Sequence, residues 1–195
     1  MKGTRQLPRS IECEGGAVEV RFMTPDDEAA LLTFAQGLPV HDMLFLPRDI
    51  AQPKVLAAWV REVERGALPS LLAVQNGRVV GCGTMVHDPQ SWSPHVAEVR
   101  VVIAPDMRGK GVGRTLAQEC FAILVADGVE KIIAQMTFDQ QGAIAVFEGL
   151  GFRSEALLRD HVQDRDGRKH DIVILSHDVA KKMAQMGAYG LTQAF

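Results

Sequence analysis

The chain has 195 residues, 47% of them apolar, and its 21 basic and 24 acidic side chains give a formal net charge of −3. This length favours a single domain with a sizeable core. The lack of a basic excess argues against a nucleic-acid partner. No apolar run approaches the ~20 residues of a membrane span, so no membrane partner is expected either.

Three cysteines cannot all pair with one another, and Cys120 falls on a helix face that is expected to be buried. Free thiols favour a reducing, cytoplasmic setting. The six histidines show no metal-ligand spacing, so no metal is expected. The basic first ten residues are not followed by the apolar run of a secretory signal.

Residues 1–16 are expected to be a flexible leader without fixed structure. Apolar and charged residues then alternate, which predicts a strand whose buried face holds Val18, Val20 and Phe22. The segment Thr24–Glu28 predicts a helix start, because threonine can cap, proline fits the first turn and acidic side chains complement the helix dipole. This helix is expected to end near Gly37.

Residues 37–53 mix prolines with large apolar residues and a few charges. Two interpretations stay open, a connecting loop that covers the core or a wall of a binding site. A second helix is expected over residues 54–65, with Val55, Trp59 and Val63 in line.

A β-meander is predicted next. Residues 70–75 and 78–86 are expected to be strands, because Asn76-Gly77 between them is a strong hairpin signal. Gly81 and Gly83 in the returning strand indicate a bulge or a close backbone approach.

The centre of the chain is a strand, a glycine-rich turn and a helix in direct succession. The β-branched run 99–103 predicts a buried strand that Pro105 and Asp106 end. Arg108–Gly113 then leads into an amphipathic helix. Such a turn suits an anion, because glycines allow close approach and the first N–H groups of a helix lack partners.

The remaining chain predicts a strand over residues 131–137, a helix over 139–150 closed by Gly151, and a last hairpin of strands 153–163 and 169–177. The order of elements indicates an α+β fold, with a mixed, mostly antiparallel central sheet flanked by helices. The domain is expected to span residues 17–178, followed by a tail over 179–195.

The spacing R-x-x-G-x-G, from Arg108 through Gly111 to Gly113, resembles the acyl-CoA pyrophosphate loop of the GNAT N-acetyltransferase superfamily. The dinucleotide fingerprint is absent, since Arg114 stands at its third glycine, and there is no Walker pattern. The resemblance implies a GNAT fold and acetyl-CoA as co-substrate, with strand N–H groups stabilising the thioester oxygen. The cofactor-binding residues expected on this basis are Val101, Val102, Ile103, Arg108, Gly109, Lys110, Gly111, Val112, Gly113, Arg114, Gln140 and Phe147.

A second segment, Gln140–Phe152, resembles the N-x-x-A-x-x-x-Y-x-x-x-G-F pattern of the same family with the same spacing. Gln140 replaces the usual Asn. Phe147 replaces a Tyr that in many members is assigned as the acid for the departing thiolate. The only tyrosine of this chain is Tyr189, so no tyrosine acid is carried over.

Glu98 is the candidate general base, because it resembles the Glu found on this strand in one branch of the superfamily. Alternation places its side chain on the same face as Arg100 and Val102. The alternative is a solvent-facing or salt-bridged carboxylate without a catalytic role. Another branch has its Glu on the next strand, where Gln135 stands, and an amide cannot act as a base.

The sequence thus predicts an acyl-CoA-dependent N-acyltransferase that moves an acetyl group to a primary amine by direct attack in a ternary complex. The acceptor is a small molecule or a protein; Asp42 and Asp49 are candidates to hold a cationic acceptor, and Arg48 a carboxylate. The alternative is a non-catalytic acyl-CoA sensor of the same fold. Phe147 and Gln135 favour it, because they stand where the family has a catalytic Tyr and, in one branch, a catalytic Glu. The resemblance also implies a possible homodimer.

Overall fold

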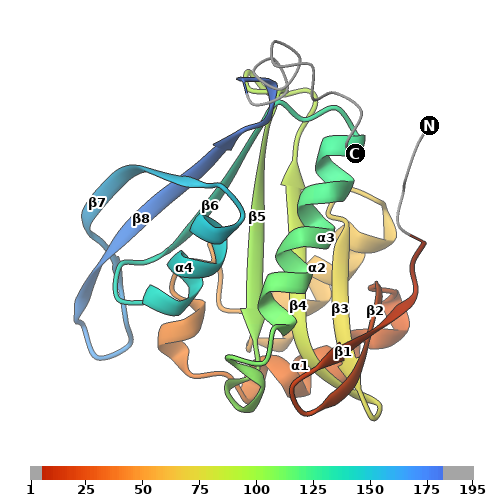
Figure 1. The fold of residues 1–195 in the computed structure, drawn as a ribbon. Helices are drawn as coiled ribbons and strands as arrows, with labels where there is room; N and C mark the ends of the chain where they lie inside the picture. The colour runs from red at the N-terminus through yellow and green to blue at the C-terminus, as the bar shows by residue number, and fades with distance from the viewer. Residues whose placement is uncertain (1–5, 182–195) are drawn as a thin grey trace.

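The computed structural model describes residues 6–181. Its strands form one sheet in the spatial order β1-β2-β3-β4-β5-β6-β8-β7 (Figure 1). Neighbouring strands are antiparallel except β5 and β6, which are parallel. The predicted α+β class with a mixed, mostly antiparallel sheet is therefore confirmed. The strands are β1 Arg9–Cys13, β2 Gly16–Phe22, β3 Ser70–Gln75, β4 Arg78–His87, β5 Val96–Ile103, β6 Lys131–Thr137, β7 Arg153–Gln163 and β8 Lys169–Asp178.

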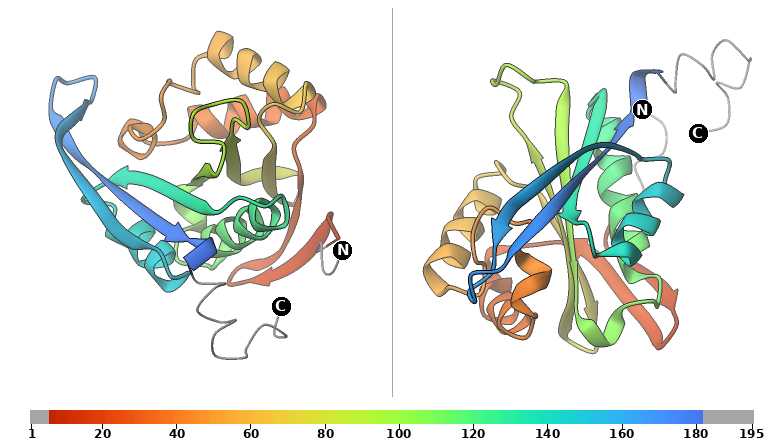
Figure 2. Two further views of the ribbon diagram at one scale, coloured as in Figure 1. Left: turned by 90° about the horizontal axis from the view of Figure 1, so that it is seen from above. Right: turned by 90° about the vertical axis from the view of Figure 1, so that its left-hand side faces the viewer.

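Helices cover both faces of the sheet. α1 and α2 lie on one face, and α3 and α4 lie on the other (Figure 2). Within residues 6–181, three short 3-10 helices connect the longer elements. The helices are η1 Pro25–Asp27, α1 Glu28–Gln36, η2 Val40–Met43, α2 Pro53–Glu64, η3 Pro105–Met107, α3 Val112–Ala126 and α4 Gln141–Gly149.

The sheet opens between its two parallel strands. β5 pairs with β4 from Ala97 to Ile103, but it pairs with β6 only at Val96, Ala97 and Glu98. β6 continues instead along β8 as far as Thr137, so β5 and β6 diverge beyond Glu98 (Figure 1). The opening is a wedge-shaped gap whose two sides are β5 and β6.

Helix α3 packs closely on β4 and β5 because two glycines make room for it. A Cβ at Gly81 would lie 3.0 Å from Cδ1 of Leu116 on α3, and one at Gly83 would lie 2.8 Å from Sγ of Cys120 on the same helix. The β3–β4 register also shifts between Ala73 and Val74, opposite Gly81. Both predicted features of this strand, a close approach and a bulge, are therefore present.

Strand β1 corrects the prediction of an unstructured leader over residues 1–16. Arg9–Cys13 pair with β2 through a turn in which Gly15 and Gly16 both have a φ of 110°. The Arg9 guanidinium also forms an ion pair with Glu119, which is buried on α3. The two glycines make a hairpin turn, and the ion pair ties the hairpin to the helix.

Two further predictions differ in detail. Phe22 is 46% exposed, because it is the last residue of β2 and lies at the edge of the face on which Val18 and Val20 are buried. In α2 the buried side chains are Leu56 and Val60, and the predicted line of Val55, Trp59 and Val63 is only half-buried. The predicted tail lies outside the described residues from position 182 onward.

Candidate active site

One side of the gap offers backbone groups. Residues 99–103 of β5 pair with β4 on one edge, and within residues 6–181 they have no ladder partner on the other. Unpaired N–H and C=O groups near a buried surface need partners. Because successive N–H groups of a strand point to alternate edges, every second residue of this stretch has its N–H free on the gap side. The role of Val101, Val102 and Ile103 in holding a thioester remains a prediction.

The glycine turn ends at an open helix N-terminus. Gly109 and Gly111 have φ of 73° and 89°, which side chains rarely tolerate, and nothing lies within 4 Å of a Cβ placed at either residue. Gly111 is the N-cap of α3, so the N–H groups of Val112, Gly113 and Arg114 belong to its first turn. Aligned donors at a helix N-terminus favour an anion.

The three cations of the turn each lie against a different part of the chain. Arg108 forms an ion pair with Asp42 of η2. Lys110 lies against the β1–β2 turn, where its Nζ would be 3.3 Å from a Cβ at Gly15. The guanidinium of Arg114 would be 3.5 Å from a Cβ at Gly149, at the end of α4. A contact with phosphate remains a prediction for each of the three.

Glu98 lies where the gap begins, and it is held by Arg100. Nε and Nη2 of Arg100 donate to the two carboxylate oxygens of Glu98 at 2.9 and 2.7 Å. Nε2 of Gln135 on β6 lies 3.5 Å from the first of these oxygens. The Glu98 side chain is 12% exposed. The structure thus shows Glu98 as a salt-bridged carboxylate, which was one of the two interpretations, and its role as a base remains a prediction.

A cavity of about 460 Å³ lies on the α2 face of the sheet. Arg100 and Val102 of β5 line it, and so do residues of the segment between η2 and α2. Part of the segment 37–53 therefore lines a cavity, as one of its two interpretations, the wall of a binding site, requires. The lining residues are Leu46, Pro47, Arg48, Ile50, Val55, Ala58, Trp59, Glu62, Leu68, Cys82, Thr84, Arg100 and Val102.

The two acidic candidates of this segment are occupied by arginines of the same chain. Asp42 pairs with Arg108, and Asp49 pairs with Arg165 from the β7–β8 turn. The Asp49 carboxylate also accepts from Ala51 N at 3.0 Å. The hypothesis that both carboxylates hold a cationic acceptor is therefore not supported by their contacts.

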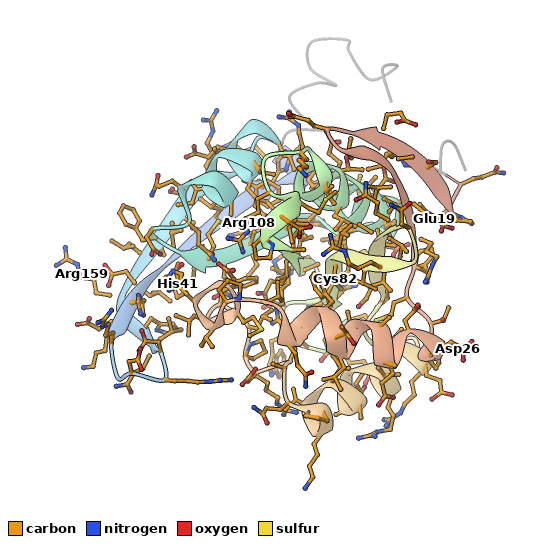
Figure 3. All side chains as sticks on the ribbon, turned by 90° about the horizontal axis from the view of Figure 1, so that it is seen from below. Glu19, Asp26, His41, Cys82, Arg108 and Arg159 are labelled. Atoms are coloured by element: carbon orange, nitrogen blue, oxygen red, sulfur yellow. The ribbon has the colours of Figure 1, made fainter. Side chains whose placement is uncertain are left out.

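Segment η2 connects the two sides of the gap. Asp42 contacts Arg108 beyond β5, while Nε2 of His41 lies 2.9 Å from Asp139 and 3.3 Å from the hydroxyl of Thr137, at the end of β6. Figure 3, which views the molecule from below, shows His41 and Arg108 near each other. A strap of four residues thus spans the open end of the gap.

A second histidine joins this strap. The rings of His41 and His170 are 4.9 Å apart at their centroids, and His170 Nε2 lies 3.0 Å from Asp164. Burial tends to raise the pKa of Asp139, but its hydrogen bonds with Thr137 and His41 outweigh this and lower it. The hydrogen bond with His170 lowers the pKa of Asp164. Sequence reasoning missed this cluster, because its members are up to 129 positions apart and carry no local motif.

Gln140 and Phe147 lie on and beside α4. Gln140 is the half-buried N-cap residue of the helix. Phe147 is 5% exposed and packs edge-to-face on Phe152, with ring centroids 5.1 Å apart. Gly151 follows the helix with a φ of 93°, as predicted. In this structure Phe147 is a core residue, and its contact with a cofactor remains a prediction.

A mixed sheet that opens between two parallel strands, with a glycine turn and a helix N-terminus beyond one of them, defines the class of acyltransferase folds that the two motifs indicated. The sequence model of the Acetyltransferase (GNAT) family matches residues 40–152 of the chain. This match covers more than half of the chain, so the chain belongs to the GNAT family.

Curated relatives are similar at low identity. The mycothiol acetyltransferase of Rhodococcus opacus is 27% identical over 151 residues, which are 75% of this chain and 48% of that protein. N-alpha-acetyltransferase 30 of Schizosaccharomyces pombe is 23% identical over 64% of this chain and 85% of its own length. The chain thus spans about half the length of the mycothiol acetyltransferases that it matches.

Solved structures share the fold. An N-acetyltransferase from Staphylococcus aureus matches with a TM-score of 0.71 and 17% identity, over 83% of this chain and 98% of that chain. The yncA structure from Salmonella typhimurium, which holds its cofactor acetyl-CoA, matches with a TM-score of 0.70 and 20% identity, over 83% and 94% of the two chains.

Two features are absent from residues 6–181. None of the helices there combines the length and the apolar character needed to cross a bilayer. No group of three or more His, Cys, Asp or Glu side chains in this range is arranged to hold a metal ion.

Proposed function

We propose that the chain transfers an acetyl group from acetyl-CoA to a primary amine, by direct attack in a ternary complex. The observation that carries this proposal is the gap that opens at Glu98 and leads along β5 to the left-handed glycines at the start of α3. Membership of the GNAT family supports it. The names of the curated relatives, among them a ribosomal protein alanine N-acetyltransferase of Escherichia coli, describe acetyl transfer as well.

The binding roles follow from the donors that the chain presents. The N–H groups of the first turn of α3, with Arg108 and Lys110 beside them, would hold the diphosphate of acetyl-CoA. The free backbone edge of residues 99–103 would face the pantetheine arm and the thioester carbonyl. Fixed N–H donors aimed at a developing oxyanion are each worth ~3–4 kcal/mol in rate. The cofactor supplies the activated acetyl group.

Glu98 is proposed to take the proton of the amine, directly or through a water. Keeping a lysine-like amine neutral at pH 7 costs ~4.6 kcal/mol, from a pKa of ~10.4 and 1.36 kcal/mol per pH unit. The amine nitrogen forms its bond to the carbonyl carbon, its proton goes to Glu98, and the C–S bond breaks to release the CoA thiolate. Arg100 holds the Glu98 carboxylate in place at the start of the gap.

The lack of a tyrosine acid at position 147 should slow the reaction less than the loss of the base would. A thiolate of pKa ~8.5 that leaves unprotonated at pH 7 forgoes at most ~2 kcal/mol. Losing the base thus costs more than losing the acid. Phe147, packed on Phe152, is therefore compatible with turnover.

A thiol-release assay with a panel of amines tests the proposal. The native chain should release CoA when an amine is present. Glu98→Gln should reduce kcat at least tenfold with little change in acetyl-CoA affinity, while Glu64→Gln on the exposed end of α2 should leave kcat unchanged. Acetyl-CoA binding with no release of CoA for any amine would instead favour a sensor.

A glycine pair tests the cofactor site. Gly111 and Gly66 both have positive φ, 89° and 73°, and open space around an added Cβ. Alanine at either position should therefore cost similar stability. Only Gly111→Ala should weaken acetyl-CoA binding, measured by calorimetry. Equal affinity for acetyl-CoA in the two variants would show that the diphosphate does not bind at this turn.

A further inference from the structure

The cavity beside Arg100 is enclosed largely by apolar side chains that are held in position. Trp59, Val55 and Ile50 contribute to its wall. The indole N–H of Trp59 donates to the hydroxyl of Ser70 at 3.3 Å, and that hydroxyl donates to the carbonyl of Leu68 at 3.0 Å. A volume of about 460 Å³ falls within the range of small-molecule sites. The cavity is therefore a preformed apolar compartment of small-molecule size.

The charges on this cavity are arranged unevenly. Strand β5 forms what we call the inner end of the cavity, and there the Arg100 guanidinium is neutralised by Glu98. The Glu62 carboxylate, also in the lining, lies 3.4 Å from the guanidinium of Arg65. Arg48 is exposed and, among the residues that the structure describes, no ion pair or hydrogen bond is found for its side chain. The cavity thus combines apolar walls with one available guanidinium.

The segment that carries Arg48 is anchored on its far side. The carboxylate of Asp49 accepts from the backbone N–H of Ala51 at 3.0 Å and from the side-chain amide of Gln52 at 3.2 Å, and it pairs with Arg165 of the β7–β8 turn. These contacts hold the backbone next to Arg48. A guanidinium on an anchored backbone suits a carboxylate, which it can bind through two parallel hydrogen bonds.

We propose that the acceptor is a small free amino acid with an apolar side chain. This inference rests on the proposed acetyl transfer. The amine lies at the inner end beside the Glu98–Arg100 pair, the apolar side chain lies against Trp59, and the carboxylate binds Arg48. A peptide N-terminus fits less well, because its first residue carries an amide in place of the carboxylate that complements Arg48.

Matched acceptors test this assignment. L-Phenylalanine and phenethylamine share the apolar body and the amine but differ in the carboxylate. The native chain should show a kcat/KM for L-phenylalanine roughly 10- to 100-fold above that for phenethylamine, the size expected for a charged hydrogen-bonded pair. Arg48→Gln should remove this difference through KM. Arg61→Gln, at an exposed position of α2 outside the cavity lining, should preserve it.

A second variant tests the compartment itself. Ala58→Phe places a ring in the cavity that Ala58 lines, so it should abolish turnover of L-phenylalanine while the Kd for acetyl-CoA stays unchanged. Turnover of a tripeptide N-terminus with no preference for free L-phenylalanine would overturn the amino-acid assignment and leave acetyl transfer intact. If the native chain neither binds acetyl-CoA nor acetylates any amine, both the acetyl transfer and the amino-acid acceptor are overturned.

Discussion

The close packing of α3 on the sheet can be tested at Gly83. A Cβ added there would lie 2.8 Å from Sγ of Cys120, and its next contacts, with Leu116, are ordinary at 3.6 and 3.8 Å. The clash is thus with a single side-chain atom of a fully buried residue. Overpacking a dense core costs about 1–3 kcal/mol, so Gly83→Ala should lower the free energy of unfolding by that amount. For a chain of this size each kcal/mol is about 2–4 °C in Tm.

Removing the opposing atom should relieve the clash. Cys120→Ala deletes one buried sulfur and by itself should cost roughly 1 kcal/mol. In the double variant the new methyl group takes up part of the space that the sulfur leaves. The double variant should therefore be more stable than Gly83→Ala by itself, and the coupling between the two changes should reach about 1 kcal/mol or more.

Urea denaturation followed by circular dichroism measures all four chains of this cycle. Gly142→Ala in α4 is the control, since nothing lies within 4 Å of its added Cβ and it should raise stability by about 0.4–1 kcal/mol. If the Gly83 and Cys120 effects add within about 0.5 kcal/mol, the contact between strand and helix is not the reason for the glycine.

Two further predictions concern ion pairs. Asp42→Asn frees Arg108 from its ion pair, so that the guanidinium no longer has to leave Asp42 in order to bind the diphosphate. Acetyl-CoA should therefore bind about two- to fivefold more tightly by calorimetry, as expected for a pair worth up to about 1 kcal/mol. Weaker binding would show that Asp42 does not compete with the diphosphate for Arg108. Asp27 accepts from Arg21 at 2.6 and 2.8 Å, and these bonds, with those from Thr24, outweigh its burial and lower its pKa. Its carboxylate therefore adds stability above the unfolded pKa of ~3.9, and this contribution is lost as the pH falls through the lower folded pKa. Asp27→Asn should cost roughly 1.5–3 kcal/mol at pH 7, and the difference from the native chain in thermal melts should shrink below about pH 4; a difference that does not change with pH would refute this.

Local chemistry was enough to predict much of the fold. The β3–β4 hairpin has its turn at Asn76-Gly77, where both residues have positive φ as this turn type requires. The strands 153–163 and 169–177 were likewise predicted to within one residue. Each of these signals lies within a few neighbouring residues, so no distant contact is needed to interpret it.

Recognising the family and predicting the gap between β5 and β6 require different kinds of information. The glycine turn at Gly109 and Gly111 could be recognised from spacing, because only glycine adopts these φ angles without strain. The divergence of β5 from β6 at Glu98 could not, because strand pairing depends on which backbone groups meet in space. Alternation did place Glu98 and Arg100 on one face, and their ion pair followed from it.

From residue 17 onward, local backbone preferences and side-chain periodicity were enough to predict most helices and strands, their order along the chain and the turn that marks the family. Other features could be seen only in the folded chain: Arg9–Cys13 join the sheet, Asp42 pairs with Arg108, and the ring of His41 contacts that of His170. These contacts join residues that are distant in the chain, and their free energy comes from packing and charge pairing, which exist only once the layers have assembled.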